Sequence, residues 1–236
     1  MRLTRPIVTV LAALAVTGAL VAGALAATSS KSTSPRSAAA AMAAMPGMSA
    51  AATTQQGGVT AESLRVALDN LFAEHAVLAM NATNAGVTGS KAFPAAAKAL
   101  DENSVAISKA IGSVYGAKAA NVFLNGKDMW RAHINDFVAY TVALSKKDTA
   151  GENAAVANLK QYTVTFGKFL AGATGLPVLA VQNDLLGHVL ELKQQLDDYA
   201  AGDYTKAAAD YHAAYNHMFM TADLIAGAIA KQKSLK

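Results

Sequence analysis

The stretch TAESLRVALDNLFAEHAVLAM, residues 60–80, decides the fold class of this chain. Its apolar residues recur mostly at spacings of three and four, the period of an amphipathic helix. They are Leu64, Val66, Leu68, Leu71, Phe72, Leu78 and Met80. Thr60 and Ser63 stand where a helix N-terminus needs side chains that bind its free backbone N–H groups. The stretch therefore predicts a long helix with one buried face, and His75 lies on that face.

The same periodicity continues to the C-terminus and is interrupted by turn residues. It predicts six helices, over about residues 60–84, 93–116, 118–144, 152–170, 178–199 and 204–231. The turn-type pair Asn125-Gly126 predicts a bend in the third helix. Six helices joined by short turns indicate an all-α antiparallel bundle.

A faint internal repeat groups these helices into three helical hairpin repeats. One histidine lies on the first helix of each hairpin, at His75, His133 and His188, with spacings of 58 and 55 residues. The second helices share a glycine, at Gly116, Gly175 and Gly227. Repeated supersecondary units of this kind pack their apolar faces together.

The N-terminal residues differ from the helical part and predict export. Arg2 and Arg5 precede an uncharged apolar run over residues 6–22, which ends near the small-x-small pattern at 24–26. This is typical of a secretory signal peptide over residues 1–26, cleaved after Ala26. An uncleaved anchor is the alternative, since about 20 apolar residues can span a bilayer. An Ala-, Ser-, Thr- and Met-rich linker over residues 27–59 then leads to the helical domain, residues 60–236.

Composition excludes several classes of function. The chain of 236 residues has a formal charge of +4, but all acids lie beyond residue 60, where lysines and arginines balance them. The part of the chain beyond residue 60 is therefore neutral and lacks the basic face that nucleic acids require, so we expect no nucleic-acid binding. Cysteine is absent, which excludes disulfides, thiolate metal sites and covalent haem attachment.

Three methionines in the linker are candidates for binding a soft metal ion. Met42, Met45 and Met48 lie within seven residues of one another. Thioethers are ligands for Cu(I). The alternative is that methionine is simply a tolerated apolar residue in an alanine-rich segment.

The histidines are the candidates for binding chemistry in the helical domain. His75, His133 and His188 lie on apolar faces, so their rings should point inward, and His217 lies on the apolar face of the last helix. His212 lies on another part of that helix and should be exposed. Neutral imidazole is a common metal ligand, and facing helices of a bundle are where such sites are built.

Two carboxylates stand three residues after these histidines. His133 with Asp136, and His188 with Glu191, have the spacing that places two side chains on one helical face. Together with the other histidines they predict a site for Cu(II) or Zn(II), in which the carboxylates bind the ion or orient the rings. The alternative is that the histidines are core residues that donate to neighbouring oxygens.

Other chemistry finds little support. A phosphate-binding glycine loop, a nucleophile elbow and a His-Glu-x-x-His zinc motif are all absent from the sequence. A haem held without covalent bonds between two histidines, or between histidine and Met80 or Met218, is an alternative without a motif. We therefore expect binding rather than catalysis.

Several segments carry a resemblance to a known family. They are Glu74-His75, ALDENS at 99–104, IGSVYG at 111–116, Trp130-x-x-His133-Ile134 and the closing segment 217–232. Over about residues 62–232 the chain resembles a family of secreted bacterial helical-repeat proteins of actinobacteria and firmicutes. Some members are joined to a domain labelled as a copper amine oxidase N-terminal domain. The resemblance implies the fold and export, and it implies no activity or site residue.

Together these observations predict a secreted or envelope-associated bundle that binds a transition metal, copper first, for sequestration, delivery or resistance. The expected partner is a metal ion, and an envelope protein is a further possible partner. The alternative is a non-catalytic scaffold of the cell envelope. The sequence leaves the oligomeric state open.

Overall fold

Every secondary-structure element in residues 58–236, the part of the chain that the computed structural model describes, is a helix. The all-α prediction is therefore confirmed for this part. The predicted signal peptide, almost all of the linker and its three methionines lie outside the described residues. The helices are α2 (Ala61–Val87), α3 (Phe93–Tyr115), α4 (Ala117–Asn125), α5 (Trp130–Lys146), α6 (Thr149–Thr174), α7 (Val178–Ala201) and α8 (Tyr204–Lys233).

The helix boundaries follow local signals in the sequence. The Thr60 hydroxyl accepts a hydrogen bond from the Ser63 backbone N–H, and the Ser63 hydroxyl accepts one from the Thr60 N–H, which completes a capping box. Gly175 ends α6 with a φ of 74°, a left-handed conformation that glycine adopts without strain. The third predicted helix is divided into α4 and α5 at the bend predicted at Asn125-Gly126, so six predicted helices become seven.

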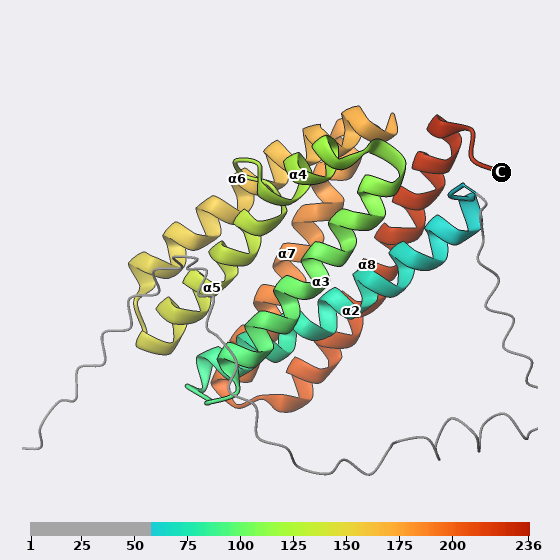
Figure 1. The fold of residues 1–236 in the computed structure, drawn as a ribbon. Coiled ribbons are helices and arrows are strands. Elements are labelled where there is room, and N and C mark those ends of the chain that lie inside the picture. Colours follow the sequence, from blue (N-terminus) through green and yellow to red (C-terminus); the bar gives the residue numbers. More distant parts are fainter. Residues whose placement is uncertain (1–57) are drawn as a thin grey trace, which may run out of the picture. The chain divides into compact units, whose positions relative to one another are not determined.

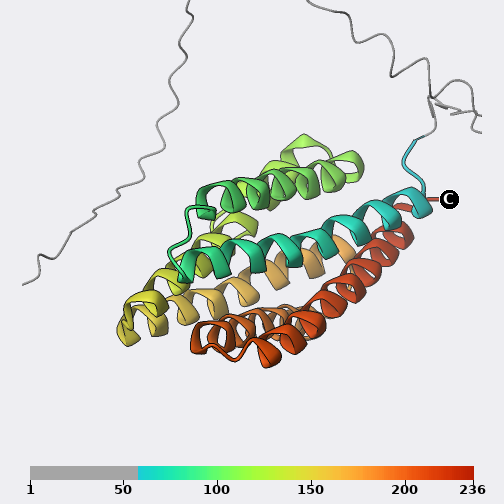
Figure 2. The ribbon, with the colours of Figure 1, turned by 90° about the horizontal axis from the view of Figure 1, so that it is seen from below.

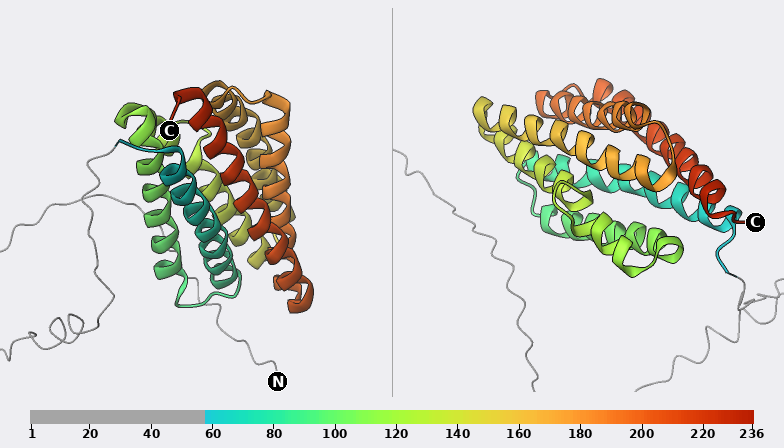
Figure 3. Two further views of the ribbon diagram at one scale, coloured as in Figure 1. Left: turned by 90° about the vertical axis from the view of Figure 1, so that its right-hand side faces the viewer. Right: turned by 90° about the horizontal axis from the view of Figure 1, so that it is seen from above.

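The long helices pack mainly against antiparallel neighbours (Figure 1). Helix α2 lies between α3 and α8 (Figure 2). Helices α8, α7, α6 and α5 then follow one another, and α5 returns to α2 (Figure 3). Helices α3 and α4 lie beside this ring and add buried side chains, such as Ile107 and Phe123, to the same core. The Ala61 N–H donates to the Lys236 carbonyl over 2.8 Å, which ties the start of α2 to the end of the chain.

The second helices of the predicted hairpins end at the same end of the bundle. At the last residue of α3, the Tyr115 hydroxyl donates to the Ala173 carbonyl of α6 and contacts the Gln232 side chain of α8. The repeat itself is not confirmed, and Gly227 lies inside α8 rather than at a helix end. None of the helices in residues 58–236 is long and apolar enough to cross a membrane.

Aromatic side chains fill the middle of the core. Trp130, the first residue of α5, is 2% exposed and stacks on Phe123 with 5.2 Å between ring centroids. Phe166 of α6 lies edge-on to Phe123 at 5.4 Å. The Trp130 indole N–H donates to the Ser104 hydroxyl over 3.2 Å. Burial of each large side chain contributes about 1.5–3 kcal/mol, and this cluster forms a rigid wall beside the histidines.

Candidate metal centre

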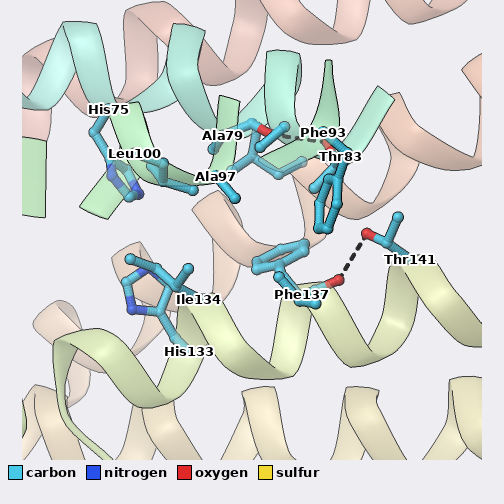
Figure 4. A pocket seen from close by; sticks show the side chains of 13 residues that line it. His75, Ala79, Thr83, Phe93, Ala97, Leu100, His133, Ile134, Phe137 and Thr141 are labelled. Carbon is cyan, nitrogen blue, oxygen red and sulfur yellow. Dashed lines mark hydrogen bonds between the residues drawn. The ribbon is translucent and has the colours of Figure 1, made fainter. Parts of the chain in front are cut away.

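Three histidines from three helices meet in the centre of the bundle. His75 of α2, His133 of α5 and His188 of α7 are 1%, 2% and 5% exposed. The ring centroid of His75 lies 5.6 Å from that of His133 and 6.2 Å from that of His188. The side chains of His75 and His133 approach each other from facing helices (Figure 4). The expected inward orientation of these rings is therefore what the structure shows.

Four ring nitrogens in this cluster have no hydrogen-bond partner among the described residues. They are Nδ1 of His75, His133 and His188, and Nε2 of His188. A buried polar atom without a partner costs about 1–3 kcal/mol. Such atoms are rare in folded proteins, so a group of four calls for a partner from outside the protein chain, such as a buried water molecule or a metal ion.

Burial keeps these imidazoles neutral. It lowers the pKa of His75 to about 4, against an opposing contribution from the nearby Asn103 amide. The pKa values of His133 and His188 are well below the usual value, first because both rings are buried and then because other histidines lie close to each. At His133 the nearby backbone of Trp130 opposes this shift. A neutral ring has a free nitrogen lone pair, which is the form that binds a metal ion.

The cluster lies between two cavities, both of which His133 lines. The larger cavity, about 40 Å³, is lined by His75, His133 and apolar side chains of α2, α3, α5 and α7 (Figure 4). The smaller, about 10 Å³, is lined by His133 and His188, by Asp184 of α7 and by Met218 of α8. A cavity of this smaller size is close to the minimum for one water molecule.

His217 occupies a different environment at the edge of the cluster. Its Nδ1 lies 2.8 Å from a Glu191 carboxylate oxygen and its Nε2 lies 3.2 Å from an Asp184 oxygen. The hydrogen bond to Asp184, followed by that to Glu191, raises the pKa of His217 to about 9 against the opposing effect of burial. His217 is therefore a charged imidazolium at neutral pH, while its neighbour His188, 6.4 Å away, is neutral.

The other predicted site residues lie elsewhere. Asp136, three residues after His133, faces α6, where it accepts from Asn158 over 3.3 Å in an open hollow. His212 is exposed, as predicted. The structure thus brings His75, His133 and His188 together, and Glu191 contacts His217 rather than these three rings.

Asp184 is the residue that sequence reasoning missed. It binds His217 and lines the same cavity as His188. The signal was present, since Asp184 and His188 are four residues apart on one helix, a spacing that places both side chains on one face.

The side chains do not already stand in the geometry of a bound ion. Within residues 58–236 no group of three His, Asp or Glu side chains meets the spacing of a metal site. Rings bound to one tetrahedral ion through nitrogens at 2.0–2.1 Å have centroids about 5 Å apart. The distances of 5.6 and 6.2 Å are slightly larger, so the rings must move inward to share an ion.

Comparison with protein-family models, with curated proteins and with solved structures gave no significant match.

Proposed function

We propose that this bundle binds copper, as Cu(I), at His75, His133 and His188, in an extracytoplasmic compartment, for sequestration, delivery or resistance. The observation that carries the proposal is the set of four unpaired ring nitrogens in three fully buried histidines. Core histidines of a scaffold would pair these nitrogens with protein oxygens or with buried water, because an unpaired buried nitrogen lowers the stability of the fold.

The surroundings favour a monovalent, soft ion. The three rings are neutral, and the larger cavity beside them is lined almost entirely by apolar groups. Burying one positive charge in such a place costs less than burying two. The thioether of Met218 is 3% exposed and lines the same small cavity as His133 and His188, which adds a soft donor of the kind that Cu(I) prefers.

The larger cavity offers a path to the cluster. Its wall includes the partly exposed side chains of Phe93, Ile134 and Val138, on α3 and α5, and it reaches the rings of His75 and His133 (Figure 4). We infer that an ion reaches the histidines by this route. A haem would require the helices to separate, since sites for molecules of that size occupy roughly 300–1,000 Å³.

The thermal stability of the protein tests the proposal. A ligand at 100 times its Kd stabilises the folded state by about 2.7 kcal/mol. Cu(I) at that excess should therefore raise the Tm by roughly 5–10 °C in a domain of this size. His75→Ala and His133→Ala should each remove most of the rise, while His212→Ala, which changes an exposed histidine, should keep it.

Differential scanning calorimetry with and without Cu(I), under reducing conditions, measures these shifts. A Tm that copper leaves unchanged in the full chain would show that the cluster holds no copper. A rise that persists in both cluster variants would place the copper elsewhere.

The linker methionines make a separate prediction. Replacing Met42, Met45 and Met48 together with isoleucine should remove one Cu(I)-binding event, because the three thioethers are lost, and should leave the Tm of the copper-free domain unchanged, since none of the described helices contains them. Competition with a Cu(I) chelator measures the affinity. Equal Cu(I) affinity in the variant and the wild type would show that these methionines are tolerated apolar residues and not ligands.

We further propose that the three hairpins are related and that the chain belongs with the secreted helical-repeat proteins it resembles. Two features support the kinship of the hairpins. Each first helix, α2, α5 and α7, contributes one histidine to the cluster. The second helices α3, α6 and α8 end together around Tyr115.

A further inference from the structure

A second group of polar side chains lies at the solvent edge of the histidine cluster. Asp184 and Glu191 of α7 contact opposite nitrogens of the His217 ring, and Thr221 of α8 donates to Asp184 over 2.9 Å. The side chains of His217, Asp184 and Glu191 are 17%, 27% and 34% exposed. Unlike the three central histidines, this group is therefore within reach of solvent.

The spacing between His217 and Asp184 matches that of two ligands on one ion. His217 Nε2 and Asp184 Oδ1 are 3.2 Å apart. Two atoms bound to a tetrahedral ion at 2.0–2.1 Å lie about 3.3 Å from each other. An ion bound to both atoms lies off the line that joins them, so the His217 ring must turn by about 35° for its Nε2 lone pair to point at the ion, while the spacing is kept.

The neighbouring groups hold both ligands in place. Glu191 accepts from Nδ1–H of His217 over 2.8 Å, the carboxylate–histidine arrangement that orients metal-bound imidazoles. Thr221 fixes the other oxygen of Asp184. Gly187 leaves room for the ring, since a Cβ there would lie 2.9 Å from Cε1 of His217.

The buried, unpaired ring of His188 is an observation independent of these hydrogen bonds. His188 is 5% exposed, neither of its ring nitrogens has a partner among the described residues, and its ring lies 6.4 Å from that of His217. It lines the same small cavity as Asp184 and Thr221. The face of α7 that carries Asp184 thus presents His188 one turn later.

We propose that Asp184, His188 and His217 form a second metal site, called the outer site below, for a divalent ion such as Zn²⁺. The His188 ring must turn toward the other two ligands when the ion binds, since no three such side chains of residues 58–236 already stand at the spacing of a metal site. Oxygen and imidazole ligands together suit this ion. Its two positive charges balance the carboxylates of Asp184 and Glu191, whereas the all-histidine cluster has no negative charge to offer. A neutral His188 has one free lone pair and serves one ion at a time, so the outer site fills in the copper-free protein.

Calorimetric titration of the copper-free full chain with Zn²⁺ tests the outer site. We expect Asp184→Asn and His217→Gln each to bind one Zn²⁺ fewer than the wild type. Glu191→Gln keeps all three ligands and should weaken that binding event by 10–100-fold, the usual effect of losing an orienting partner. The controls are Asp198→Asn on α7 and His212→Gln on α8, which should bind zinc as the wild type does.

Zinc binding that is the same in the wild type, Asp184→Asn and His217→Gln would overturn the outer site and leave these residues as an ion pair that holds α7 to α8. Should those two variants fail to fold by circular dichroism, Glu191→Gln decides, and unchanged zinc affinity in it overturns the proposal. The zinc titration contains no copper, so it tests the outer site separately from the copper function. If copper leaves the Tm of the wild type unchanged while zinc binding still depends on Asp184 and His217, the copper function is refuted and the outer site is retained.

Discussion

Lowering the pH from 7 to 4 is expected to destabilise the metal-free protein by several kcal/mol. The buried histidines carry this effect, because their pKa values are lower in the folded state than in the unfolded chain. Below pH 6.5 the histidines of the unfolded chain bind protons, whereas the buried histidines of the folded state stay neutral. Their contribution to the free energy of unfolding is therefore fully present above pH 6.5 and decreases as the pH falls. For His75, whose pKa falls from 6.5 to about 4, the loss is on the order of 3 kcal/mol.

His217 acts in the opposite direction. Its pKa in the folded state is raised to about 9 by Asp184 and Glu191. Its contribution is therefore complete below pH 6.5 and is lost as the pH rises through 9. The two effects together place the stability maximum of the metal-free protein near neutral pH.

Urea unfolding at a series of pH values measures this profile. Because carboxylates also titrate in this range, the comparison that isolates the histidine is with His75→Leu, whose stability should fall less steeply between pH 6.5 and 4. Equal slopes for the two proteins would show that His75 takes up its proton to the same extent in the folded and the unfolded state, so that folding does not lower its pKa.

Replacing His188 with leucine is expected to stabilise the metal-free protein while abolishing both proposed metal sites. The substitution removes two buried nitrogens that have no partner among the described residues. The free energy of unfolding should therefore rise by about 1–3 kcal/mol. Residues that serve binding often lower the stability of the fold, and His188 would be one of them. Copper should then no longer raise the Tm, and the outer zinc event should disappear.

Denaturant midpoints of the metal-free proteins, with His212→Leu as the exposed control, measure the change in stability. A loss of 1–3 kcal/mol on His188→Leu would instead mean that the imidazole nitrogens have partners in the folded protein, such as bound water. That result would favour the scaffold interpretation of the core histidines.

Much of the fold was predictable because local signals and packing agree. Periodicity placed the helices, and Thr60 with Ser63 marked the start of the first one. The inward orientation of His75, His133 and His188 followed from their place on apolar faces, which tertiary packing must bury.

The partners of individual side chains were not predictable in the same way. Helical spacing shows that Asp136 shares a turn with His133, but not which neighbouring helix that side chain meets, and it meets Asn158 of α6. Likewise, the pairing of Asp184 with His217 joins residues 33 positions apart. It depends on how α7 packs on α8, which no local pattern encodes.

The place of Trp130 gives the protein a built-in optical reporter. It is the only tryptophan of the chain, and its ring centroid lies 4.8 Å from that of His75 and 4.9 Å from that of His133. An ion bound between those imidazoles would change the surroundings of the indole and therefore its emission, whereas one held by Asp184 and His217 would lie farther from it. Intrinsic fluorescence can thus distinguish occupancy of the two proposed sites during a metal titration, without a label.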